Sequence, residues 1–91
     1  PLIKRDIAIL LDNKYKNVDI MKSIKNNGGK FLTDIQLFDY YEDEKIGKNK
    51  KSLAYSLTFR SKEKTLEDKD INSNINQIVN TLKNKFKAIQ R

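Results

Sequence analysis

The clearest pattern in the chain is an alternation along residues 51–60, K-S-L-A-Y-S-L-T-F-R. Every second position is a large hydrophobic residue: Leu53, Tyr55, Leu57 and Phe59. A period of two predicts a β-strand with one buried face. The positions between are serine, alanine and threonine, where lysine or glutamate is the ordinary choice on a solvated strand. The pattern therefore predicts a strand with a flat second face, suited to a stacked, negatively charged ligand.

Hydrophobic spacing and turn residues place five further elements. Strands are expected over 3–11 and 31–41, and a faint closing strand over 88–91. A short helix opens at Asn17 or Asp19 and ends at 27–29, Asn-Gly-Gly, where a glycine supplies the left-handed turn. A long helix opens at Thr65 or Asp68. Its apolar stripe is the best helical signal in the chain: Ile71, Ile75, Ile78, Val79, Leu82 and Phe86.

This β-α-β-β-α-β order predicts an α+β fold of the ferredoxin-like kind. In that architecture both helices cover one face of a four-stranded antiparallel sheet, and the first and third strands are central. The large hydrophobic residues of the two central strands must then face the helices. The opposite phase is left to line an open face, with these residues: Ala8, Leu10, Ser52, Ala54 and Ser56.

The second strand interrupts its own alternation at Leu37-Phe38. A β-bulge at this point accounts for the interruption, because a bulge adds one residue and reverses the phase that follows. Asp39 and Tyr41 are then expected on the open face and Tyr40 on the inward face.

Four residues converge where the first three strands meet on this open face: Ala8, Asp39, Tyr41 and Ser52. A tyrosine ring stacks on a nucleobase, and aspartate and serine offer hydrogen-bonding groups to a base edge. The alanine permits close approach. The set is typical of contact with splayed, single-stranded RNA. The alternative is a strand-edge tyrosine and a turn aspartate that bind no ligand.

The charge balance favours a polyanionic partner, since 19 Lys and Arg oppose 12 Asp and Glu for a net charge of +7. The loop over 42–51 turns from acidic to basic, and we expect Lys50 and Lys51 to contact phosphates. Phosphate contacts position RNA without reading its sequence. The alternative is that most of these lysines are ordinary solvated surface.

Several classes of function are excluded by composition. The chain has no cysteine and no histidine, so disulfides, zinc sites and histidine-based catalysis are ruled out. No apolar run approaches the about 20 residues of a membrane span. With 91 residues, the chain is expected to be one cytoplasmic domain, residues 1–91, cut from a longer protein.

Two relatives of the fold are excluded by local sequence. Acylphosphatase-like catalysis needs a glycine-rich, arginine-bearing loop after the first strand, but that loop reads D-N-K-Y-K-N. The RNA recognition motif places aromatic residues of its third strand on the open face. Here Tyr55 and Phe59 lie in the helix-facing phase.

Four collinear stretches resemble one known family: R-D-I-A-I-L-L-D (5–12), G-G-K-F-L-T-D-I-Q-L-F-D-Y-Y (28–41), K-K-S-L-A-Y-S-L-T-F-R (50–60) and T-L-E-D-K-D-I-N (65–72). They are similar to the ferredoxin-fold anticodon-binding domain at the C-terminus of bacterial phenylalanyl-tRNA synthetase β subunits. The resemblance covers nearly the whole chain, and its motifs are specific.

The resemblance implies a domain without catalytic or metal residues of its own that grips the anticodon stem-loop of phenylalanine tRNA. The parent enzyme it implies is an (αβ)2 heterotetramer, which uses ATP and magnesium at a distant site in the α subunit. By motif, the family's anticodon contacts fall on Ala8, Asp39, Tyr41 and Ser52, with the tyrosine stacking on a base. The α subunit and the tRNA are the implied partners, and no membrane is involved.

Three departures from the family pattern affect this interpretation. Lys64 replaces a common arginine before T-L, which weakens a bidentate phosphate contact. Glu42-Asp43-Glu44 stands where members often carry a glycine, which changes how the loop meets RNA. F-K-A at 86–88 replaces F-G-A, so the long helix lacks its glycine stop.

A second hypothesis is a docking module that holds another part of the parent enzyme through its sheet or edge strands, without RNA specificity.

Overall fold

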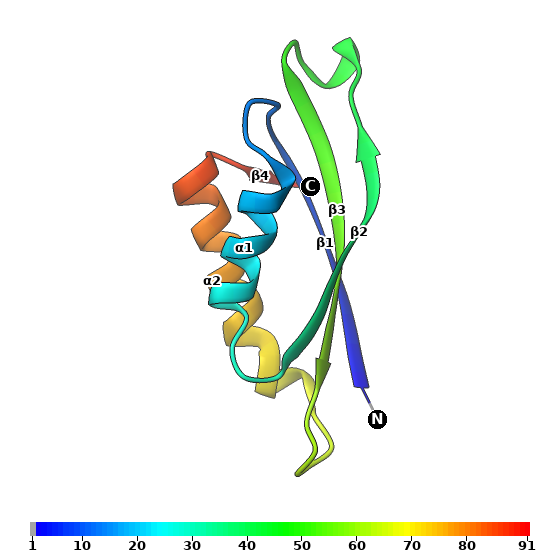
Figure 1. Ribbon diagram of the computed structural model, residues 1–91, viewed down its shortest axis with the longest axis vertical. Coiled ribbons are helices and arrows are strands. Elements are labelled where there is room, and N and C mark those ends of the chain that lie inside the picture. Colours follow the sequence, from blue (N-terminus) through cyan, green and yellow to red (C-terminus); the bar gives the residue numbers. More distant parts are fainter. Residues whose placement is uncertain (1) are drawn as a thin grey trace.

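The computed structural model describes residues 2–91 and confirms the ferredoxin-like α+β fold. Its strands are β1 (Leu2–Asp12), β2 (Leu32–Tyr41), β3 (Lys50–Arg60) and β4 (Ile89–Gln90), and its helices are α1 (Asn17–Asn27) and α2 (Asp68–Phe86). The strands form one antiparallel sheet in the order β2-β3-β1-β4, so the first and third strands are central as predicted. Both helices pack on the same face of the sheet (Figure 1).

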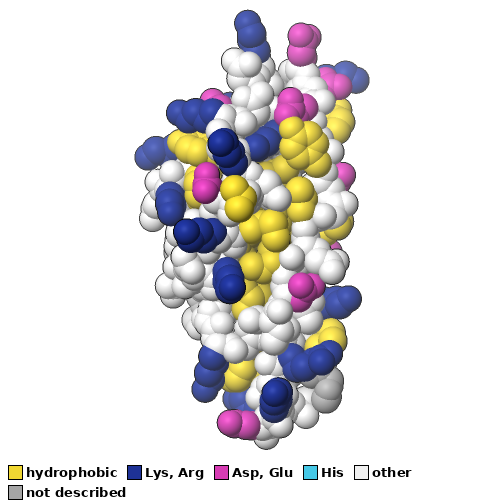
Figure 2. Space-filling view, in the orientation of Figure 1, with side chains coloured by type: hydrophobic (Ala, Val, Ile, Leu, Met, Phe, Trp, Pro, Cys, Tyr) yellow, Lys and Arg dark blue, Asp and Glu magenta, His cyan; other side chains and the backbone are white. Residues whose placement is uncertain are grey.

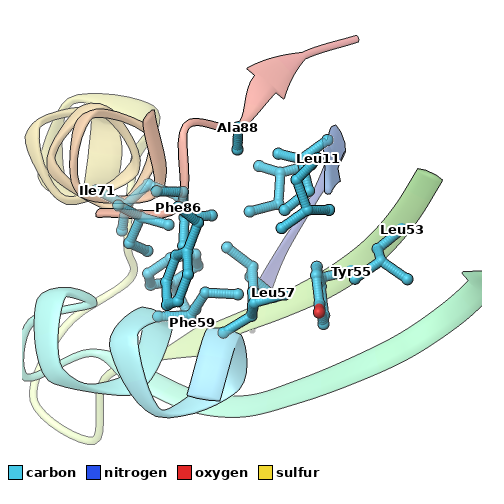
Figure 3. Packing of buried hydrophobic residues seen from close by; sticks show 14 of the residues in the cluster. Leu11, Leu53, Tyr55, Leu57, Phe59, Ile71, Phe86 and Ala88 are labelled. Atoms are coloured by element: carbon cyan, nitrogen blue, oxygen red, sulfur yellow. The ribbon is translucent and has the colours of Figure 1, made fainter. Parts of the chain in front are cut away.

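The core lies between the sheet and the two helices. The alternating hydrophobic residues of β3 are fully buried there, together with those of β1. Figure 3 shows side chains of this cluster, with those of β3 on one side and Ile71 and Phe86 of α2 on the other. Burial of this apolar surface is the main favourable contribution to folding. It also fixes the phase of both central strands, which turns their small and polar residues to the uncovered face.

The start of α1 differs from the expectation. Asn17 is the first helical residue, but neither it nor Asp19 caps the helix, because the N-cap position is Lys16 and carries no side-chain cap. The Asn17 side chain has another use. Its Oδ1 accepts a hydrogen bond of 2.6 Å from the Tyr55 hydroxyl, which joins α1 to the centre of β3. At the other end of α1, Gly29 supplies the left-handed turn with φ of +78°.

The end of α2 is made without a glycine. Lys87 adopts the left-handed conformation, with φ of 55° and ψ of 29°, directly after Phe86. The Ala88 N–H then donates to the Leu82 carbonyl at 3.3 Å, and Ala88 itself is buried. The chain can therefore turn back to the sheet and add β4 beside β1, as the sequence predicted.

The hairpin between β2 and β3 projects beyond the ends of both helices (Figure 1). A short 3-10 helix, η1 (Glu44–Ile46), forms its tip. The Asp43 carboxylate accepts a hydrogen bond of 2.8 Å from the Lys45 N–H and so caps η1. β3 begins at Lys50, so the connecting loop is shorter than the predicted 42–51. Neither helix within residues 2–91 has the length and apolar character to cross a membrane.

Candidate nucleic-acid interface

A bulge at Phe38 sets the face on which each residue at the end of β2 lies. Leu37 pairs with Tyr55 of β3, and the next pair is Asp39 with Ala54, so Phe38 is the extra residue. Tyr41 then pairs with Ser52. Directly opposed residues of neighbouring strands share a face of the sheet. Asp39 and Tyr41 therefore lie on the open face, as the broken alternation predicted.

β1 brings the fourth predicted residue to the same face. Ala8 pairs with Ala54, whose other neighbour is Asp39, and these three form one row across the sheet. Leu10 pairs with Ser52 in the row that also holds Tyr41. Ala8 carries only a methyl group, which permits a bound group to approach the sheet closely at this position. The structure thus places Ala8, Asp39, Tyr41 and Ser52 together on the open face.

Arg91 also lies at this site, and the sequence analysis did not include it. Its backbone N–H donates to the Ala8 carbonyl at 2.8 Å, which extends the pairing of β4 with β1. Its guanidinium donates a hydrogen bond of 2.9 Å to Oγ of Ser52, two strands away. A guanidinium is always charged and carries five donors, so it adds a cation to a surface that also carries the Asp39 carboxylate. No periodic signal in the sequence marks its position, because β4 is only two residues long.

The environment of Tyr41 keeps its phenol neutral. Partial desolvation raises the pKa of the Tyr41 hydroxyl, and the neighbouring Asp43 carboxylate raises that pKa further, whereas the charge of Arg91 lowers it. The side chain is 43% exposed. A neutral, accessible aromatic ring beside a guanidinium is chemically suited to stack on a nucleobase without repelling its phosphate.

The prediction for Tyr40 is correct for its face and wrong for its burial. It pairs with Leu53 and so lies on the helix-facing side, as the bulge predicted, but it is not covered. Its side chain is 54% exposed because the hairpin extends past the helices, and its hydroxyl hydrogen-bonds to the Glu42 carboxylate. Glu42 and Asp43 therefore each engage a different tyrosine, and this carboxylate pair supports the hairpin tip.

The two lysines predicted to contact phosphate have different surroundings. Lys50 is exposed and pairs with Asp12 on the open face. Lys51 pairs with Leu11 on the helix-facing side and is only 6% exposed. Its ammonium donates to the Tyr15 carbonyl, which ties the β1–α1 turn to β3. The placement of Lys51 contradicts its predicted contact with phosphate, and the phase it shares with Leu53 already signals this.

A groove on the surface lies away from this site, between α1 and the edge strand β2. Its volume is about 650 Å³, and a strip of hydrophobic side chains runs along the corresponding part of Figure 2. Its lining residues are Asn17, Val18, Met21, Lys22, Lys25, Leu32, Thr33, Asp34 and Ile35. None of the predicted contact residues is among them. A stacking site on a sheet is a flat surface, so the contact residues are not expected to line this groove.

Comparison with known proteins relates the chain to one family. The family description "ferredoxin-fold anticodon binding domain" matches residues 1–91. The phenylalanine–tRNA ligase β subunit of Listeria monocytogenes is 46% identical over 91 residues, which are 100% of this chain and 11% of that protein. The β subunit of Pseudoalteromonas translucida is 44% identical over 91 residues, with the same coverage of both chains. That of Clostridium tetani is 42% identical over 88 residues, 97% of this chain and 11% of the relative. The chain thus spans about a tenth of the length of these curated relatives.

Proposed function

This chain belongs to the ferredoxin-fold anticodon binding family, and we propose that it grips the anticodon stem-loop of phenylalanine tRNA through the open face of its sheet. In this proposal it is the RNA-binding module of a phenylalanine–tRNA ligase β subunit. The aminoacylation reaction, with its ATP and magnesium, belongs to the α subunit of the parent assembly. The domain contributes binding and no catalytic group.

The observation that carries the proposal is the grouping of four side chains at one end of a face that neither helix covers. Tyr41 provides an aromatic platform, and the Asp39 carboxylate provides acceptors for donor groups on a base edge. Ser52 and Arg91 are joined by a hydrogen bond and provide donors for a base or a phosphate. Aromatic stacking with hydrogen bonds to base edges is the common way in which proteins recognise unpaired RNA bases.

Electrostatics supports the same ligand. With a net charge of +7, the domain attracts RNA from solution in a salt-dependent manner. The carboxylates of the hairpin tip oppose a phosphate beside Tyr41, whereas Arg91 and Lys50 attract one nearby. This arrangement favours a base at Tyr41 with its phosphate turned toward the guanidinium.

A chemical-shift titration tests the proposal. The domain is titrated with the anticodon stem-loop of phenylalanine tRNA and, separately, with a hairpin of the same stem and a scrambled loop. We expect the first RNA to perturb the amides of Ala8, Asp39, Tyr41 and Ser52, and the second to perturb them less at equal concentration. Perturbations confined to lysines of the helices, or equal responses to both RNAs, would contradict the proposal.

One observation favours the second function, docking within the parent enzyme. The groove between α1 and β2 is lined in part by apolar side chains and borders β2, an edge strand of the sheet that the described residues form. Edge strands with adjacent apolar surface are suited to hold another polypeptide. The same titration separates the two functions, because a docking module without RNA specificity would show no preference between the two hairpins.

A further inference from the structure

Two outward-facing hydrophobic side chains continue the open face beyond the candidate site. Ile89 of β4 pairs with Leu10 of β1, which in turn pairs with Ser52. Ile89 is 63% exposed, and Leu10 is partly exposed beside it. A polar residue is the ordinary choice at an outward position of a two-residue edge strand. An adjacent aliphatic pair on an uncovered sheet therefore calls for an explanation.

The register places this pair in the same row as the stacking tyrosine. Read across the sheet, the row is Ile89, Leu10, Ser52 and Tyr41. Because the backbones of neighbouring strands lie about 4.8 Å apart, the Leu10 backbone is about 10 Å from that of Tyr41, and the Ile89 backbone is about 14 Å from it. Ser52 separates Leu10 from Tyr41 in the row, and Ile89 lies one strand further, so the face has room for a second group beside a base stacked on Tyr41.

A cation lies between Tyr41 and the aliphatic pair. The Arg91 guanidinium contacts Ser52, the residue that separates Leu10 from Tyr41 in the row. The face thus presents an aromatic ring, then a guanidinium, then an aliphatic pair. Two successive nucleotides of a splayed strand present a base, a phosphodiester and a second base. The order of chemical groups across the sheet face therefore matches the order of groups along the RNA strand.

We propose that Leu10 and Ile89 form a second base-binding subsite next to Tyr41, with Arg91 holding the phosphodiester that joins the two nucleotides. The ligand class is single-stranded RNA with at least two adjacent unpaired bases. Aliphatic side chains contact the face of a base and provide no hydrogen bonds, so this subsite accepts any base, as sequence-tolerant stacking platforms do. The inference rests on the proposed function and adds a second contact to it.

The test uses the anticodon stem-loop of phenylalanine tRNA with one abasic nucleotide placed at each loop position in turn. Affinities are measured by fluorescence anisotropy for the unaltered domain and for Tyr41→Ala, Ile89→Ser and Leu10→Ser. Val18→Ser is the matched control, because Val18 is an aliphatic residue 67% exposed on α1, away from the open face. Amide spectra of each variant confirm that it is folded.

For the unaltered domain, we expect abasic substitution to weaken binding at two adjacent loop positions. Tyr41→Ala should abolish the sensitivity at one of them. Ile89→Ser should weaken binding by about fivefold, the effect of losing part of an isoleucine's burial, and should abolish the sensitivity at the other. Val18→Ser should change neither the affinity nor the profile.

Two results overturn the subsite, and they differ from a failure of the proposed function. If Ile89→Ser and Leu10→Ser bind with unaltered affinity and profile while Tyr41→Ala weakens binding, the second subsite does not exist and the RNA site remains. If Ile89→Ser weakens binding but leaves both abasic sensitivities intact, the side chain does not contact a base. If Tyr41→Ala has no effect either, the proposed function fails together with the subsite.

Discussion

The Arg91 guanidinium donates a hydrogen bond of 2.9 Å to Oγ of Ser52, across β1 from one edge strand of the sheet to a central strand. The Arg91 backbone is held in turn by the Ala8 carbonyl at 2.8 Å. These two bonds place a permanent positive charge beside Tyr41, on the open face. Arg91 is therefore the candidate contact residue whose position depends most on the structure and least on the sequence pattern.

Replacement of Arg91 tests this placement. We expect Arg91→Ala to weaken binding of every RNA hairpin and to reduce the slope of log K against log salt by about one, as for one lost phosphate contact. Arg91→Lys should retain the slope, because the charge remains, while losing the fixed geometry of the guanidinium. An unchanged salt slope in Arg91→Ala would show that its charge does not meet a phosphate.

Lys50 and Lys51 are expected to behave differently although they are neighbours. Lys50→Ala should lower RNA affinity at low salt and leave the free energy of unfolding unchanged, because the side chain is exposed. Lys51→Ala should lower the free energy of unfolding by about 1–3 kcal/mol, because a buried hydrogen bond from a charged donor is lost. Urea denaturation and binding isotherms on both variants separate these effects. A stability loss for Lys50→Ala and none for Lys51→Ala would reverse the assignment.

The contrast between these lysines shows what the sequence determines. Strand phase and the Phe38 bulge follow from local alternation, because a one-residue change moves every later side chain to the other face. The helix positions follow from the helical spacing of apolar residues. Lys51 has the same phase as Leu53, so its inward position was available from the pattern. The position of Arg91 at the site could not be predicted from such a pattern. A two-residue strand has no periodicity of its own, and the reach of an arginine across two strands is a matter of tertiary structure.

The exposure of Tyr40 and the use of Asn17 depend on tertiary structure for the same reason. The face on which Tyr40 lies follows from the bulge, but its exposure depends on how far the helices extend along the sheet. Asn17 has the residue type of a helix cap, which is why the sequence suggests one. A partner 38 positions away, Tyr55, accounts for its side chain instead.

Tyr55→Phe tests the hydrogen bond between α1 and β3. Burial raises the pKa of the Tyr55 phenol well above its ordinary value, so the hydroxyl stays protonated and donates to Asn17 Oδ1. We expect the variant to lose about 1 kcal/mol of unfolding free energy, the net contribution of one hydrogen bond. A double-mutant cycle with Asn17→Ala measures the coupling. Strictly additive losses would mean that the two side chains do not interact.

The left-handed Lys87 predicts a stabilising substitution. A residue other than glycine loses about 1–2 kcal/mol in this conformation, so Lys87→Gly should raise the free energy of unfolding by about 0.5–1 kcal/mol after the greater entropy of the unfolded chain is deducted. Lys85→Gly is the control, since the same change within the helix should destabilise by about 1 kcal/mol. Urea midpoints with unchanged slopes give both values. If both variants are destabilised alike, the left-handed turn is not strained.

The most direct measurement of the central claim compares two adjacent tyrosines on opposite faces of β2. Tyr41 lies on the open face beside Arg91, and Tyr40 lies on the helix-facing side with similar exposure. Binding of the anticodon stem-loop of phenylalanine tRNA is measured for Tyr41→Ala and Tyr40→Ala, each also against a scrambled-loop hairpin. We predict a loss of about 1–3 kcal/mol for Tyr41→Ala with the cognate loop only, and no loss for Tyr40→Ala. Equal losses for the two variants, or a loss for Tyr40→Ala alone, would contradict recognition of RNA by the open face.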